Sequence, residues 1–142
     1  MNKNSHPQKI HSELHAAAKL VREQAYAPYS GFKVGAALLA DDGHIYVGCN
    51  VENAAYPEGQ CAEASAISAM IAGGGKRVCE ILIVKKGKGK IAPCGGCRQK
   101  LNEFADAKLP VFVQGEDGEL QGYSLGELLP IAFGKTNLEN TS

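Results

Sequence analysis

Two short cysteine-containing blocks constrain the fold of this chain most strongly. Residues 61–63 read CAE and residues 93–97 read PCGGC. Each block lies where a helix is expected to begin, because an apolar helical pattern follows the first and a proline opens the second. Amides at a helix N-terminus stabilise thiolate, the form of cysteine that binds metal. A fold that brings both helix starts together therefore places three thiolates, Cys61, Cys94 and Cys97, around one metal ion.

Three cysteine ligands are typical of a zinc site that keeps one position for water. Structural zinc sites usually have four protein ligands, whereas catalytic sites have three. Glu63 stands two residues after Cys61, so its carboxylate can point at that water without binding the metal. The pattern therefore predicts one Zn²⁺ held by three thiolates, with Glu63 beside the bound water.

The C-x-x-C at residues 94–97 also fits other chemistry. By itself it is equally typical of a thiol–disulfide oxidoreductase, which needs no metal. A structural zinc module would keep the metal but would not need Glu63. The upstream CAE block favours a catalytic zinc site. The odd total of five cysteines argues against a disulfide framework, and Cys49 and Cys79 are expected to be small buried hydrophobic residues.

The charge balance of the chain excludes several classes of partner. Fifteen basic and fifteen acidic residues give no net charge, which argues against nucleic-acid and anionic-membrane binding. The four lysines within residues 85–90 are expected to form a solvated loop rather than a phosphate site. No apolar run is long enough to span a bilayer, and the polar N-terminus is unlike a signal peptide. We therefore expect a cytoplasmic protein.

Apolar periodicity and turn residues predict an α/β fold. A helix from residue 5 or 7 to residue 25 precedes two strands, 33–40 and 45–50, joined by a turn at 41–43. The further expected elements are a loop at 52–60, a helix from 61 that ends at the glycines 73–75, a strand at 78–84, a helix at 94–104, strands at 110–114 and 121–124, a helical turn at 125–129 and a frayed tail at 134–142. This order predicts a mixed five-stranded sheet with helices on both faces.

Both cysteine blocks and three further segments resemble the zinc-dependent cytidine deaminases. The blocks match the three-cysteine form of the deaminase signature, in which P-C-x-x-C follows a C-x-E. The further segments are YSGFKVGAA at residues 29–37, GCNVENAAY at 48–56 and LLPIAF at 128–133. The resemblance extends over residues 14–133 and is closest to the small homotetrameric enzymes that act on free nucleosides. It implies a single domain over residues 1–142, with flexible ends and the three-layer deaminase fold.

The resemblance implies hydrolytic deamination of cytidine and 2′-deoxycytidine to uridine and 2′-deoxyuridine, with release of ammonia. Zinc lowers the pKa of a bound water to about 7, so hydroxide is available at neutral pH to attack C4 of the cytosine ring. Glu63 then carries the proton of the water to N3 and later helps to protonate the departing amine.

The resemblance also implies which residues contact a small-molecule nucleoside: Phe32, Asn50, Glu52, Ala54, Tyr56 and Phe133. Asn50 and Glu52 hold the ribose hydroxyls, and Phe32 lines the base pocket. Tyr56 lies at the subunit junction, and Phe133 reaches the site of a neighbouring subunit. The expected assembly is a homotetramer whose active sites are completed by neighbouring subunits.

One position departs from the family pattern. Many members with three cysteines have an arginine directly after the catalytic glutamate, where it offsets the thiolate charge, but this chain has Ala64. We hypothesise that the helix N-termini and Arg98 compensate. Residues 57–60 also depart from the pattern. The nearest alternative function is therefore deamination of a modified cytosine nucleoside such as blasticidin S, and a polynucleotide-editing deaminase is less compatible with the charge balance.

Overall fold

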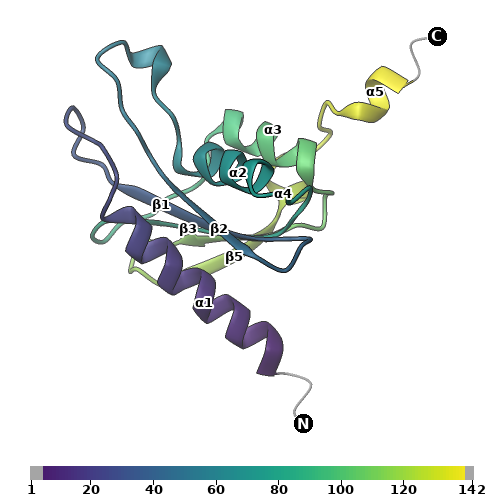
Figure 1. Ribbon diagram of the computed structural model, residues 1–142, viewed down its shortest axis with the longest axis horizontal. Helices are drawn as coiled ribbons and strands as arrows, with labels where there is room; N and C mark the ends of the chain where they lie inside the picture. The colour runs from purple at the N-terminus through teal and green to yellow at the C-terminus, as the bar shows by residue number, and fades with distance from the viewer. Residues whose placement is uncertain (1–4, 140–142) are drawn as a thin grey trace.

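The computed structural model describes residues 5–139. Within this range, a single five-stranded sheet has the order β2-β1-β3-β4-β5. The helices lie on its two faces, with α1 on one side and α2 and α3 on the other (Figure 1). The elements are α1 (Ser5–Arg22), β1 (Val34–Ala40), β2 (Ile45–Cys49), the 3₁₀ turn η1 (Tyr56–Glu58), α2 (Ala62–Ala72), β3 (Val78–Lys85), α3 (Gly95–Phe104), β4 (Pro110–Gln114), β5 (Leu120–Ser124), α4 (Leu125–Leu128) and α5 (Lys135–Glu139).

The sheet is mixed, as the order of elements predicts. β1 pairs antiparallel with β2 and with β3, β3 pairs parallel with β4, and β4 pairs antiparallel with β5. The strand–helix–strand unit β3-α3-β4 therefore gives directly paired parallel strands. In the unit β2-α2-β3 the two strands run in the same direction but do not pair, because β1 lies between them.

Both faces of the central strands are buried. On one face Ala37 and Leu82 pack with Leu14 of α1, and on the other Leu38 and Ile81 belong to the core beneath α2 and α3. Side chains of a strand alternate between faces, so a strand covered on both sides has a continuous apolar sequence, as β1 and β3 do.

Two glycines let the helices approach the sheet closely. A Cβ at Gly35 would lie 2.1 Å from the carbonyl oxygen of Ala18 in α1, and a Cβ at Gly48 would lie 2.3 Å from the amide nitrogen of Ala66 in α2. Any side chain at these positions would push its helix away. Gly48 thus sets the distance between the sheet and α2, the helix that follows Cys61.

The structure corrects four details of the sequence predictions. The first helix ends at Arg22 rather than at residue 25. Residues 135–139 form α5, where a frayed tail is expected, and residues 140–142 lie outside the described residues. Cys79 is exposed and Cys49 only half-buried, so neither is the buried hydrophobic residue expected. Cys49 is the last residue of β2, an edge strand, and Cys79 lies near the start of β3, where the register with β1 shifts. In residues 5–139, no helix is both long and apolar enough to cross a bilayer.

Candidate active site

Three cysteine sulfurs converge where α2 and α3 begin. Cys61 is the N-cap residue of α2, Cys94 is the N-cap residue of α3, and Cys97 lies in the first turn of α3. Their Sγ atoms all lie within 4.8 Å of one another. In a tetrahedral site with Zn–S bonds of about 2.3 Å, two sulfurs are separated by about 3.8 Å. The donor set and its spacing therefore fit one zinc ion with three protein ligands.

The surroundings of the three thiols differ. The backbone N–H of Cys97 lowers the pKa of Cys94, as expected for an acceptor at a helix N-terminus. Burial instead raises the pKa of Cys61 and, more strongly, that of Cys97. A cation is therefore needed to keep all three as thiolates, so metal binding at this site is coupled to proton release.

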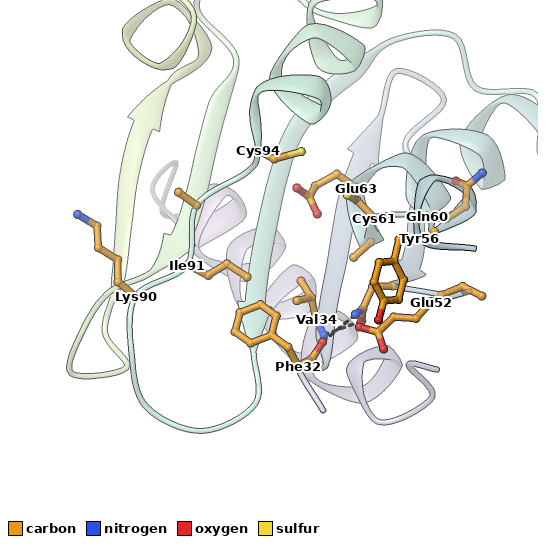
Figure 2. Close-up of a pocket in the computed structure, with 15 residues that line it drawn as sticks. Phe32, Val34, Glu52, Tyr56, Gln60, Cys61, Glu63, Lys90, Ile91 and Cys94 are labelled. Atoms are coloured by element: carbon orange, nitrogen blue, oxygen red, sulfur yellow. Dashed lines mark hydrogen bonds between the residues drawn. The ribbon is translucent and has the colours of Figure 1, made fainter. Parts of the chain in front are cut away.

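Glu63 lies beside the sulfurs in the first turn of α2. Its side chain is buried, with 5% exposed. Burial raises the pKa of its carboxyl, while hydrogen bonds with its own backbone amide and with Cys97, and the charge of Lys100, oppose this shift. Figure 2 shows the carboxylate directed toward Cys94. Glu63 can therefore exchange a proton with a group held next to the sulfurs.

A pocket of about 550 Å³ opens onto these groups, with Cys61, Glu63 and Cys94 in its lining. This volume suits a small ligand such as a nucleoside. Four of the residues that the sequence predicts to bind substrate line the same pocket: Phe32, Asn50, Glu52 and Tyr56. Phe32 precedes β1, Asn50 and Glu52 follow β2, and Tyr56 lies in η1. These segments meet at one end of the sheet.

Asn50 is bonded to the backbone that carries Phe32. Its Nδ2 donates to the carbonyl oxygen of Phe32 at 2.7 Å, and its Oδ1 accepts from the amide of Val34 at 2.8 Å. An amide side chain has two N–H groups and two oxygen lone pairs. One donor and one acceptor position of Asn50 therefore remain for a ligand.

The carboxylate of Glu52 is held by the loop before β1. Its Oε1 accepts from the backbone amides of Tyr29 at 3.0 Å and Ser30 at 3.1 Å, and its Oε2 accepts from the Ser30 hydroxyl. The Ser30 hydroxyl bond is the main reason that the pKa of Glu52 lies below its ordinary value. Glu52 thus presents an ionised carboxylate, and Ser30 is a supporting residue that the sequence analysis did not single out.

Two residues of the predicted substrate-binding set do not line this pocket. Ala54 is exposed in the loop that follows β2. Phe133 has 59% of its surface exposed, and its carbonyl oxygen accepts hydrogen bonds from Gln99 and Asn102 of α3. The backbone of Phe133 is therefore anchored to α3 while its ring faces outward.

The guanidinium of Arg98 donates hydrogen bonds to two backbone carbonyl oxygens from different parts of the chain. Its Nε donates to the carbonyl oxygen of Pro93 and its Nη1 to that of Leu128, both at 2.8 Å. These bonds connect the segment before Cys94 to the end of α4. Ala64, directly after Glu63, is buried, and its methyl group offers no hydrogen-bond donor to the sulfurs.

Part of the pocket wall was not predicted from the sequence. Lys90, Ile91 and Ala92 line the pocket, although the lysine-rich stretch is expected to be a solvated loop. Lys85 also lies over the ring of Phe32, with Nζ 5.4 Å from the ring centre. Residues 90–92 stand directly before the PCGGC block, and this position is the one sequence signal that could have indicated that they line the pocket.

Known proteins match this chain over most of its length. A model of the family described as "Cytidine and deoxycytidylate deaminase zinc-binding region" matches residues 8–113. The cytidine deaminase of Sporosarcina psychrophila is 44% identical over 126 residues, which cover 89% of this chain and 93% of that protein. A cytidine deaminase of Mycobacterium tuberculosis is 42% identical over 114 residues, covering 80% of this chain and 82% of that protein.

Solved structures give the same result. The crystal structure of cytidine deaminase from Burkholderia pseudomallei matches with a TM-score of 0.80 and 46% identity, over 87% of this chain and 98% of that chain. That of the M. tuberculosis enzyme matches with a TM-score of 0.77 and 40% identity, over 87% and 97%. These matches confirm the predicted fold and zinc-binding character. Because they extend over most of the chain and include both cysteine blocks, this chain belongs to the zinc-binding cytidine and deoxycytidylate deaminase family.

Proposed function

We propose that this protein converts cytidine and 2′-deoxycytidine to uridine and 2′-deoxyuridine, with water consumed and ammonia released. The observation that carries the proposal is the buried carboxylate of Glu63 beside three convergent sulfurs in a pocket of about 550 Å³. A thiol–disulfide oxidoreductase would need neither the third sulfur nor the carboxylate. The similar proteins named above are cytidine deaminases, which also disfavours the blasticidin S alternative.

Zinc bound by Cys61, Cys94 and Cys97 supplies Lewis acidity that activates water at neutral pH. Glu63 takes a proton from the attacking water as its oxygen bonds to C4, and delivers that proton to N3 of the ring. Glu63 then takes the proton of the new C4 hydroxyl and passes it to the exocyclic nitrogen, so that the C4–N4 bond breaks, C4 becomes a carbonyl and ammonia leaves. The burial of Glu63 supports this role because it limits proton exchange with bulk solvent.

Substrate orientation comes from residues at the pocket mouth. The remaining donor and acceptor of Asn50 and the ionised carboxylate of Glu52 are suited to the ribose hydroxyls. Phe32 lines the pocket and offers an apolar face for the base, with 45% of its surface exposed. Tyr56 and the exposed Ala54 loop complete the proposed substrate contacts from this subunit.

The proposed assembly is a homotetramer in which Phe133 enters a neighbouring site. The segment that carries Phe133 supports this assembly. Ile131 in the same segment is fully exposed and has φ of 51°, a left-handed conformation that costs a residue other than glycine about 1–2 kcal/mol. An exposed apolar side chain on strained backbone is well suited to a contact between copies. Analytical ultracentrifugation tests the assembly, and a monomer that binds cytidine normally would contradict it.

We also propose a cytoplasmic location, because all five cysteines are free thiols and three of them form the metal site. Such thiols need a reducing compartment. Arg98 stays the proposed compensating charge, acting through the Pro93 carbonyl that it binds. Unchanged zinc retention and an unchanged pH–rate profile in an Arg98→Ala variant would exclude this role.

The central experiment measures zinc content and the ultraviolet absorbance change on adding cytidine or 2′-deoxycytidine. Purified protein should contain one zinc per chain and convert both substrates. Glu63→Gln should keep the metal and lose about 10²–10⁴-fold in kcat, the usual contribution of a general acid–base group. Glu13→Gln, an exposed glutamate on α1, is the matched control and should retain full activity. Zinc-loaded protein that leaves both nucleosides unchanged would refute the proposal.

A further inference from the structure

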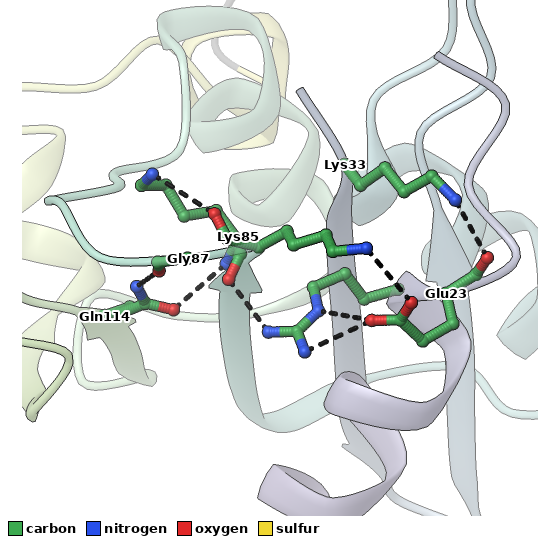
Figure 3. A network of polar contacts seen from close by, with 7 residues as sticks. Glu23, Lys33, Lys85, Gly87 and Gln114 are labelled. Carbon is green, nitrogen blue, oxygen red and sulfur yellow. Dashed lines mark hydrogen bonds and ion pairs between the residues drawn. The ribbon is translucent and has the colours of Figure 1, made fainter. Parts of the chain in front are cut away.

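Gln114 is a buried amide whose side chain is fully engaged with one loop. It is the last residue of β4 and has 6% of its surface exposed. Its Oε1 accepts from the backbone amide of Lys85 at 3.2 Å, and its Nε2 donates to the carbonyl oxygens of Gly87 at 2.7 Å and Gly89 at 3.2 Å. Figure 3 shows the bonds of Gln114 to Lys85 and to Gly87 at the end of β3. A side chain that both donates and accepts is required here, because the loop presents one donor and two acceptors.

The loop depends on this amide for its path. Residues 86–91 lie between β3 and the PCGGC block and have no regular secondary structure. Gly87 has φ of 77° and Gly89 has φ of 111°, conformations that bring both carbonyls to the same Nε2. Backbone bonds from Gly89 to Glu116 and from Ile91 to Gln114 complete the attachment.

The same loop forms one wall of the pocket. Lys90 and Ile91 lie on one side of the pocket in Figure 2, and Glu52 and Tyr56 on the other. At the start of the loop, the amide of Lys86 donates to the carbonyl oxygen of Lys33 at 3.0 Å.

The Lys33–Lys86 bond lies next to Phe32, over whose ring the Nζ of Lys85 is placed at 5.4 Å. The bonds of Gln114 to Lys85, Gly87 and Gly89 therefore hold the loop that carries Lys90. Through Lys85 and the Lys33–Lys86 bond they also support the segment that carries Phe32.

We propose that Gln114 is a positioning residue for nucleoside binding, which acts by holding residues 85–92 against the pocket. The inference rests on the proposed function. Gln114 does not line the pocket, so its effect on substrate passes through Lys90, Ile91 and Phe32.

The metal site is held separately from this loop. Cys94 and Cys97 belong to the start of α3, and Arg98 holds the Pro93 carbonyl at 2.8 Å. Loss of the Gln114 bonds should therefore loosen the pocket wall without displacing the sulfurs. The expected signature is a raised KM for cytidine with unchanged kcat and zinc content.

The first test replaces the amide by an apolar group of similar length. Gln114→Met should raise KM about five- to tenfold, the size expected when buried polar groups lose their partners. Gln121→Met makes the same chemical change at an exposed position on β5 and should leave KM unchanged. Trypsin should cut Gln114→Met faster than wild type after the lysines of residues 85–90, and cytidine should slow that cleavage.

A second test changes the backbone of the loop and leaves Gln114 in place, with a matched glycine elsewhere as control. Gly87→Ala places a Cβ in open space but strains the left-handed backbone, and Gly43→Ala does the same in the distant β1–β2 turn. Gly87→Ala should reproduce the KM increase, and Gly43→Ala should not. This pair decides the question even when Gln114→Met fails to fold.

The outcomes separate this inference from the proposed function. Wild type that does not deaminate cytidine would refute the function, while the trypsin result would still report whether Gln114 holds the loop. An unchanged KM in Gly87→Ala, or equal losses of kcat in both glycine variants, would overturn the positioning role.

Discussion

The side-chain amide of Asn50 donates a hydrogen bond to the carbonyl oxygen of Phe32, with 2.7 Å between nitrogen and oxygen. Asn50 follows β2, whereas Phe32 precedes β1. The bond therefore joins the two segments of the pocket mouth that the resemblance assigns to ribose and to base. A residue proposed to bind substrate is at the same time a structural part of the pocket.

Replacement of Asn50 by aspartate should affect binding and stability together. Asn50→Asp keeps the acceptor for the Val34 amide but turns a carboxylate oxygen toward the Phe32 carbonyl. We expect a loss of about 1–3 kcal/mol in the free energy of unfolding, as for an unsatisfied polar group, and a higher KM. Urea denaturation and steady-state kinetics measure both effects. Asn53→Asp, in the exposed loop, is the control, and equal effects of the two changes would contradict the prediction.

Removal of the Ser30 hydroxyl should shift the acid limb of the pH profile. The hydroxyl bond holds the pKa of Glu52 below its ordinary value, so the carboxylate stays ionised until the pH falls through that low pKa. Ser30→Ala raises the pKa, and binding should therefore be lost at a higher pH than in wild type. The profile of kcat/KM against pH tests this, with Ser12→Ala as control. Superimposable acid limbs would show that Ser30 does not tune Glu52.

Glu80 should make stability fall as pH rises. It lies on β3 facing α1, where burial raises the pKa of its carboxyl and the charge of His11, 3.9 Å away, lowers it less. The folded state then holds the proton more tightly than the unfolded chain, so stability is greatest below the unfolded pKa and declines through the folded pKa. Glu80→Gln has a side chain that is always neutral. It should therefore be more stable than wild type at about pH 8, and the difference in stability should be smaller at about pH 5. Thermal unfolding measures this, and a pH-independent difference would argue against it.

A methyl group at Gly48 should displace α2. The Cβ of Gly48→Ala would lie 2.3 Å from the Ala66 amide nitrogen and 2.6 Å from the Ala62 carbonyl oxygen, so the helix must move. We expect a loss of about 1–3 kcal/mol, typical of overpacking, together with weaker zinc retention because α2 begins next to Cys61. Gly43→Ala, in the distant β1–β2 turn with open space around the new Cβ, is the control for metal analysis. Wild-type stability in Gly48→Ala would mean that α2 is not closely packed there.

Local signals in the sequence predict most of the elements. The continuous apolar strands β1 and β3 follow from burial on both faces, and the cysteine blocks predict helix starts that the structure places at Cys61 and Cys94. These features depend on residues that are close in the sequence, so the rules of apolar periodicity and helix capping predict them. The exposure of Cys79 and the helix at residues 135–139 were not predicted, because each depends on where a strand end or tail lies relative to the rest of the fold.

The sequence by itself determined the chemistry of this protein: three thiols, one carboxylate and the spacing that selects zinc. Only the tertiary structure decided which groups form the walls around that chemistry. The bonds of Gln114 to residues 85–89, of Ser30 to Glu52 and of Arg98 to Leu128 join segments far apart in the chain. Such contacts arise where segments distant in the chain pack together in the fold, and no local pattern of residues encodes them.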